Sequence, residues 1–206
     1  MDSSSLAKLE EKQRPLSADI RLLGGLLGQI IKEQEGDSAF ELVEAVRSAA
    51  KGRRSGEEGA AEKVAALIAD TDLHQKRMLV KAFGNYLQLI NIAEDQQRIR
   101  TLRRREITRG LSESVQRAIR DFKATGMSAD EVRALLDKIR VRLVLTAHPS
   151  EAKRQELLIK LRDIADRMTL RERQDLLPYE LRWIEDDIVR RIEQLWQIRP
   201  TRVARA

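Results

Sequence analysis

The stretch VRLVLTAHPSEAKRQE, residues 141–156, interrupts a chain whose other segments favour helix. Its apolar and partly β-branched run, Leu143 to Thr146, is typical of a short buried strand. The order predicted around it is helix, short strand, turn, helix. The sequence therefore predicts a mostly α-helical fold with one short strand at about 141–146.

The residues after the strand predict a turn and a new helix. Pro149 disfavours helical geometry at His148 and pushes it toward an extended conformation. Ser150 is suited to cap a helix whose first turn holds Glu151. We expect this helix to run from Ser150 to about Met168.

His148 occupies the position from which a βα unit usually contacts its ligand, the carboxyl end of a strand. Imidazole titrates near neutrality, so it can transfer a proton or donate a hydrogen bond to an anion. The N-terminus of the new helix, with Lys153 and Arg154, adds positive potential nearby. From these residues alone, a structural histidine in a loop stands as the alternative to a catalytic one.

Apolar residues recur three or four positions apart along most of the remaining chain, which is the helical period. Ser128 and Glu131 form a capping-box pattern, and the helix that follows should bury Val132, Leu135, Leu136 and Ile139. The predicted helices cover Leu16 to Ile31, a second segment reaching about Lys51, 60–69, Leu73 to Arg105, 126–140 and 173–197.

The composition sets limits on the class of protein. Hydrophobic residues make up 42% of the 206 residues, which is enough for a core, and the chain has no cysteine for a disulfide or a thiolate metal site. Residues 1–15 are polar and predict a flexible tail rather than a signal peptide. No apolar run approaches the length of a membrane helix. A soluble, cytoplasmic protein is expected.

The net charge of +6 permits an anionic partner, and the basic run 98–110 holds six arginines against one acid. One interpretation is a phosphate-contacting patch for nucleic acid. The simpler interpretation is a solvated helix end, because no aromatic residue is interleaved for stacking on bases. Nucleic acid is therefore not the expected partner. His74 and the aspartates at 70, 72, 186 and 187 are likewise best explained as exposed charges rather than metal ligands.

Four stretches of the chain resemble the phosphoenolpyruvate carboxylase family. The stretch VLTAHPSEAKRQELLIK, 144–160, is similar to the family's N-terminal histidine signature. The segments 19–56 and 81–100 are similar to its opening helices, and EQLWQIRPTRVARA, 193–206, to the segment that follows the histidine. The resemblance covers most of the chain and keeps the family's order.

The resemblance implies an enzyme that adds bicarbonate to phosphoenolpyruvate with Mg2+ or Mn2+, giving oxaloacetate and phosphate. His148 would be the catalytic residue, placed at the carboxyphosphate intermediate to help remove a proton and release CO2. Arg154 would support phosphate binding or the helix terminus. The implied fold is an expanded α/β barrel, with 16–140 as its helical N-terminal region and 141–206 as the truncated start of the barrel. The complete enzyme would be a homotetramer.

The sequence also departs from the family's pattern. The Thr-Asp-Glu that usually follows the Trp-Gln pair is missing after Trp196 and Gln197. The family's metal-binding acids, its glycine-rich loop and its remaining arginines lie beyond position 206, so no metal ligand is expected in this chain. We therefore expect the chain alone to be inactive. The alternative from another class is a non-catalytic helical module that binds through its basic face.

Overall fold

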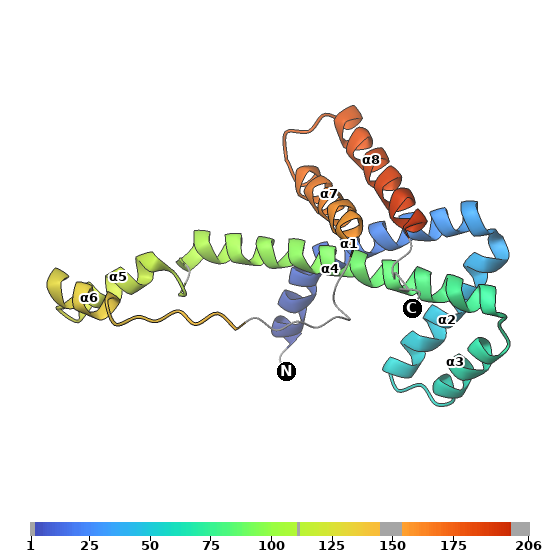
Figure 1. Ribbon diagram of the computed structural model, residues 1–206, viewed down its shortest axis with the longest axis horizontal. Helices are drawn as coiled ribbons and strands as arrows, with labels where there is room; N and C mark the ends of the chain where they lie inside the picture. Colours follow the sequence, from blue (N-terminus) through green and yellow to red (C-terminus); the bar gives the residue numbers. More distant parts are fainter. Residues whose placement is uncertain (1–2, 111, 145–153, 199–206) are drawn as a thin grey trace, which may run out of the picture. The chain divides into compact units, whose positions relative to one another are not determined.

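The computed structural model describes residues 3–110, 112–144 and 154–198, and these form helices α1 to α8 (Figure 1). The helices are α1 (Ser3–Glu35), α2 (Asp37–Arg54), α3 (Ala60–Ala69), α4 (Leu73–Arg109), α5 (Val115–Ala124), α6 (Ala129–Leu136), α7 (Gln155–Arg171) and α8 (Pro178–Gln197). The predicted helix-rich fold is confirmed for these residues.

The first helix begins earlier than the predicted start at Leu16, and the flexibility predicted for 1–15 stays a prediction. Helix α1 begins at Ser3 and continues through Pro15. Proline inside a helix removes one backbone hydrogen bond and crowds the preceding turn, which bends the helix. The dark blue start of α1 accordingly runs in a different direction from the rest of the helix (Figure 1).

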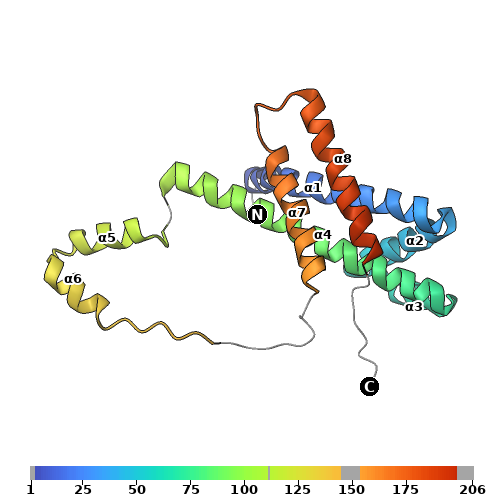
Figure 2. The same cartoon turned by 45° about the horizontal axis from the view of Figure 1, so that its top comes forward.

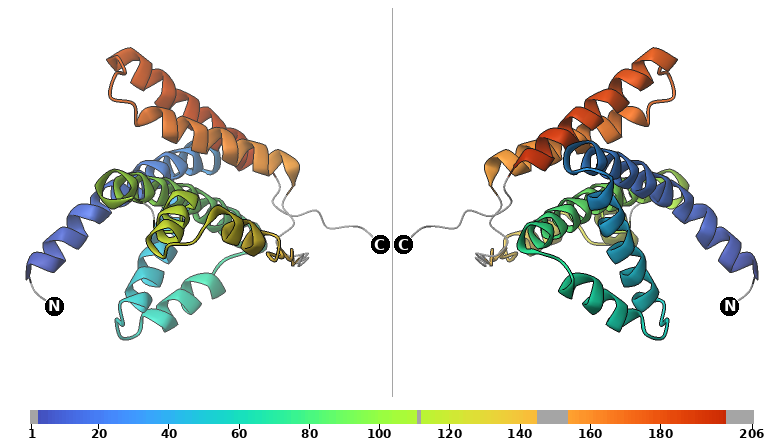
Figure 3. Two further views of the ribbon diagram at one scale, coloured as in Figure 1. Left: turned by 90° about the vertical axis from the view of Figure 1, so that its left-hand side faces the viewer. Right: turned by 90° about the vertical axis from the view of Figure 1, so that its right-hand side faces the viewer.

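Contacts divide the chain into two compact units, the first made of residues 1–97 with 153–206 and the second of 98–152. In the first unit, α7 and α8 form a hairpin whose α8 packs on α1 (Figure 2). A second hairpin, α2 with α3, follows α1 (Figure 3). The predicted boundary between a helical region, 16–140, and the start of a barrel, 141–206, stays a prediction.

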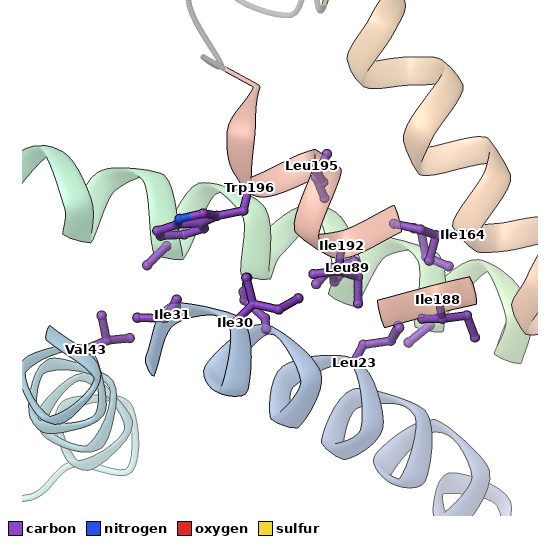
Figure 4. Packing of buried hydrophobic residues seen from close by; sticks show 14 of the residues in the cluster. Leu23, Ile30, Ile31, Val43, Leu89, Ile164, Ile188, Ile192, Leu195 and Trp196 are labelled. Atoms are coloured by element: carbon purple, nitrogen blue, oxygen red, sulfur yellow. The ribbon is translucent and has the colours of Figure 1, made fainter. Parts of the chain in front are cut away.

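The core of the first unit lies between α1, α4, α7 and α8 (Figure 4). Its largest fully buried side chains are Leu23, Ile30, Ile31, Leu89, Ile164, Met168, Ile188, Ile192, Leu195 and Trp196. On α8 the buried residues Ile184, Ile188 and Ile192 are four positions apart, and Leu195 and Trp196 lie three and four positions after Ile192, so that all five form a single stripe on the helix. The low aromatic content makes this core mainly aliphatic.

The second unit contains the end of α4 with α5 and α6. The capping box predicted before α6 is confirmed, since the Ser128 backbone N–H donates to the Glu131 carboxylate at 2.8 Å and Glu131 N–H donates to the Ser128 hydroxyl at 3.3 Å. The buried face predicted for this helix is wrong, because Leu135 and Leu136 are exposed. Neither α5, which was not predicted, nor α6 has a buried residue.

The predicted strand at 141–146 is not formed in its described part, residues 141–144. The side chains of Val141, Leu143 and Val144 are 83%, 80% and 77% exposed. A strand needs a neighbouring strand to accept and donate its backbone hydrogen bonds. The described residues include no other strand, so this apolar segment has no sheet to join.

None of the helices in the described ranges is both long enough and apolar enough to cross a bilayer.

Candidate functional site

The predicted site surrounds the start of α7. His148, Ser150 and Lys153 lie outside the described residues, so their predicted roles are untested. Arg154 is described, and it is the residue immediately before the helix. The predicted helix start at Ser150 is corrected for the described part, where α7 begins at Gln155.

Arg154 caps the helix with its backbone rather than its side chain. Its φ of −61° and ψ of 140° are extended, and its carbonyl accepts the N–H of Leu158 at 3.1 Å. An extended residue cannot continue a helix, which explains why α7 starts after it. The side chain makes no capping hydrogen bond, so it is available for another role.

The Nε atom of Arg154 is buried and has no hydrogen-bond partner among the described residues. A buried donor without an acceptor costs about 1–3 kcal/mol, and more when the group is charged. The first turn of α7 adds backbone N–H groups that have no partner within the helix. The start of α7 therefore presents positive potential and an unsatisfied guanidinium donor, a combination suited to an anion.

Helix α7 is held in place by ion pairs with α8 that sequence reasoning did not find. Arg167 Nε lies 2.6 Å from Asp187 Oδ2, and Arg191 Nη1 lies 2.7 Å from Asp163 Oδ2. A third pair joins Arg171 Nε to Glu185 Oε1 at 2.9 Å. The sequence signal that could have predicted these ion pairs is the presence of opposite charges on two helices joined by a short loop.

Asp187 is the centre of this set of charges. It also accepts a hydrogen bond from Arg190 at 3.2 Å, and Arg191 Nε lies 3.7 Å from it. The hydrogen bond from Arg167, followed by the positive charge of Arg191, holds the pKa of Asp187 below its usual range, against the opposing effect of burial. The aspartate therefore anchors α7 to α8, and its side chain is less exposed than the sequence interpretation of an exposed charge expected.

A buried glutamine on α4 fixes α7 from the other side. Gln96 is almost fully buried, and its amide nitrogen donates to the carbonyl of Ala165 at 3.1 Å and to the hydroxyl of Thr169 at 2.8 Å. Because both acceptors lie on α7, this side chain sets where α7 rests on α4. The start of α7 is thus positioned by contacts with two other helices.

The two tryptophans of the sequence have different environments. Trp196 is 1% exposed, its indole N–H donates to Glu35 at 3.2 Å, and Lys81 Nζ lies 4.1 Å from its ring centroid. Burial lowers the pKa of Lys81, partly offset by Glu35. Trp183 is 73% exposed and contacts Tyr179 edge to face. Only the first of them stabilises the core.

Other sequence candidates do not gather into a second site. The arginines at 103, 104 and 105 are exposed in the last turns of α4, without interleaved aromatics. Among the described residues, no three histidine, cysteine, aspartate or glutamate side chains lie where they could share a metal ion. The described part of the chain therefore does not fit a resident divalent metal.

Comparison with known proteins gives the same family along nearly the whole chain. The sequence profile described as phosphoenolpyruvate carboxylase matches residues 16–206. Proteins named phosphoenolpyruvate carboxylase are similar to it in Azorhizobium caulinodans (35% identical over 190 residues), Ectopseudomonas mendocina (35% over 194) and Ralstonia nicotianae (36% over 200). These matches cover 91%, 92% and 94% of this chain and 20%, 22% and 20% of the relatives.

The fold is that of a helical protein with positive potential at the start of one helix, α7. The matched profile then identifies the chain as belonging to the phosphoenolpyruvate carboxylase family. The chain spans about a fifth of the length of the relatives it matches.

Proposed function

We propose that the chain forms part of an enzyme that carboxylates phosphoenolpyruvate with bicarbonate, and that it supplies residues of the active site. The observation that supports this most directly is Arg154, whose buried Nε, at the N-terminus of α7, has no hydrogen-bond partner in the described part of the chain. This residue follows the histidine motif by a few positions, inside the region matched to the family. An anionic substrate would provide the missing acceptor.

The proposed reaction proceeds in three steps. A bicarbonate oxygen attacks the phosphorus of phosphoenolpyruvate, which gives carboxyphosphate and the enolate of pyruvate. His148 then takes the proton of carboxyphosphate, its C–O bond to phosphate breaks, and CO2 and phosphate are released. The enolate carbon attacks CO2 and gives oxaloacetate. A neutral imidazole is suited to the proton transfer because its pKa lies near the working pH.

Arg154 would act by holding a phosphate or carboxylate oxygen while charge moves during the first step. A guanidinium keeps its charge at any working pH and donates in a fixed planar geometry. The divalent metal, Mg2+ or Mn2+, would neutralise phosphate charge and would be held by residues outside this chain. The complete enzyme is proposed to be a cytoplasmic homotetramer, and the chain alone to be inactive.

A chimera tests this proposal. Residues 16–206 replace the corresponding segment of the Azorhizobium caulinodans relative, and oxaloacetate and phosphate are measured separately. We expect His148→Asn to abolish oxaloacetate formation while some bicarbonate-dependent phosphate release persists, because only the second step needs the imidazole. His74→Asn is the matched control and should leave both rates unchanged, since this side chain is mostly exposed.

Arg154→Gln provides a second variant in the same chimera. We expect kcat/KM for phosphoenolpyruvate to fall about tenfold or more, the size of one lost charge-assisted contact. Arg162→Gln, an exposed arginine on the same helix, should change it little. Full carboxylation by His148→Asn would contradict the assigned catalytic residue, and equal effects of the two arginine variants would contradict a role for Arg154.

A further inference from the structure

A cavity of about 460 Å3 lies between α1, α2 and α4 in the first compact unit. Its lining includes Gly24, Gly25 and Gly28 of α1 and aromatic side chains of α2 and α4. Sites for small molecules typically enclose about 300–1,000 Å3. The volume is therefore suitable for a compact organic ligand.

Two of the glycines are explained by packing. A Cβ at Gly24 would lie 3.2 Å from Tyr86 Cε2, and a Cβ at Gly28 would lie 2.9 Å from Phe40 Cε2. The two rings therefore rest close to the backbone of α1, and a side chain at either position would push its ring away. Glycine inside a helix costs about 1 kcal/mol relative to alanine, and close ring packing accounts for that cost here.

Gly25 is not explained in this way. A Cβ built there meets no atom within 4 Å. Packing within the described residues therefore does not require a glycine at this lining position, and a side chain would occupy space that the cavity leaves open. A substitution at Gly25 therefore adds a side chain beside the cavity whose Cβ contacts neither ring.

The basic side chains that line the cavity differ in whether they are paired with a carboxylate. Arg47 donates two hydrogen bonds to Glu44, at 2.8 and 2.6 Å, and Lys32 Nζ pairs with Asp37 Oδ1 at 2.8 Å. The structure gives no hydrogen bond or ion pair to the Arg21 guanidinium among the described residues, and this side chain is exposed. The lining thus offers one guanidinium whose charge is not already matched by a carboxylate.

We infer that this cavity binds a small aromatic monocarboxylate. The ring of the ligand lies over Gly25 between the rings of Phe40 and Tyr86, where aromatic contacts and apolar walls favour it. The carboxylate pairs with the guanidinium of Arg21. A ligand with a single negative charge fits best. A phosphate dianion carries two negative charges, and Arg21 could neutralise only one of them. The second charge would be repelled by the carboxylate of Glu44. This binding does not depend on the proposed carboxylation reaction.

The test uses the 206-residue chain and 2-naphthoate as the probe, with binding measured by titration calorimetry and by changes in glycine amide signals in NMR spectra. We expect saturable binding of one molecule per chain, with shifts at Gly24, Gly25 and Gly28. Gly25→Leu should weaken binding about tenfold or more by filling the cavity. Gly84→Leu is the matched control, because Gly84 is also an exposed glycine inside a helix with open space, and it does not line the cavity.

Charge is tested separately. Arg21→Gln should weaken 2-naphthoate binding about tenfold while leaving the neutral analogue 2-naphthalenemethanol unaffected, and Arg77→Gln, an exposed arginine of α4, should change neither. Circular dichroism confirms that each variant is folded, and Gly25→Ala replaces Gly25→Leu if the larger residue prevents folding. Absence of saturable binding to the unmodified chain, or equal loss in Gly25→Leu and Gly84→Leu, would overturn the inference.

Discussion

At the scale of single residues, burial distinguishes side chains that the sequence presents as equivalent. Isoleucines at 192 and 159 both lie in helices, but the first is fully buried and the second is half exposed. Burial of an aliphatic side chain stabilises the folded state, and its truncation in a close-packed core leaves a cavity. Stability at the centre of the first unit therefore depends on residues such as Ile192, where α8 meets α1 and α4.

Ile192→Ala is expected to lower the free energy of unfolding by about 2–5 kcal/mol, because it removes buried methyl groups and leaves a cavity. Ile159→Ala provides the control at a half-exposed site, where the change should stay within about 1 kcal/mol. Urea unfolding followed by circular dichroism measures both. Equal losses in the two variants would show that α8 does not pack as described.

At the scale of helices, the α7–α8 hairpin depends on charge as well as on apolar packing. Asp187 accepts from arginines on both helices, and Gln96 joins α7 to α4. These contacts set the position of Arg154, since it directly precedes α7. The anion-binding potential of the candidate site is therefore a consequence of how α7 is anchored.

Asp187→Asn is expected to destabilise the protein by about 1–2 kcal/mol near neutral pH, since partly exposed pairs contribute little individually but this residue serves several arginines. The folded-state pKa of Asp187 is lowered, so its contribution is present above the pKa of the unfolded chain and is lost as the pH falls through the folded-state pKa. The difference between the unmodified chain and the variant should therefore shrink from about pH 7 to about pH 3.

Urea unfolding at a series of pH values measures this difference. Asp186→Asn is the matched control, because the Asp186 side chain is exposed, is given no hydrogen bond or ion pair among the described residues, and directly precedes Asp187. A difference for Asp187→Asn that does not change with pH would contradict the role of the ion pairs.

At the scale of the whole molecule, the two compact units differ in how much apolar surface they bury. The core residues belong to the first unit, whereas α5 and α6 contain no buried residue. Helices of ten and eight residues are marginal in water without packing partners. The second unit is therefore expected to open far more readily than the first.

Amide hydrogen exchange followed by mass spectrometry tests this expectation. Amides of α5 and α6 should exchange much faster than those of α8 and of α1 around Ile30, because only the latter are protected by a packed core. Comparable protection in both units would show that α5 and α6 are held by contacts absent from the described structure.

Local signals in the sequence were sufficient for the position of most helices. The capping box at Ser128 depends on neighbouring residues only, and the helix that it begins is formed. The predicted helix start at Ser150 was wrong for residue 154, which is extended, so that α7 begins at Gln155. Ser150 has a favourable capping side chain, but that preference alone does not decide where a helix begins. The candidate site was predicted in part, since Arg154 was named but its unsatisfied Nε depends on its surroundings.

The sequence by itself determined the helical class of the chain, its family and the residues proposed for catalysis, because periodicity and motifs depend on the order of residues. Only the tertiary structure decided which apolar stripes are buried, since α8 finds partners in α1 and α4 and α6 does not. It also decided that 141–144 form no strand and that a cavity lies over Gly25. Burial, strand pairing and cavities each need a second surface, and distance along the chain does not specify which surface that will be.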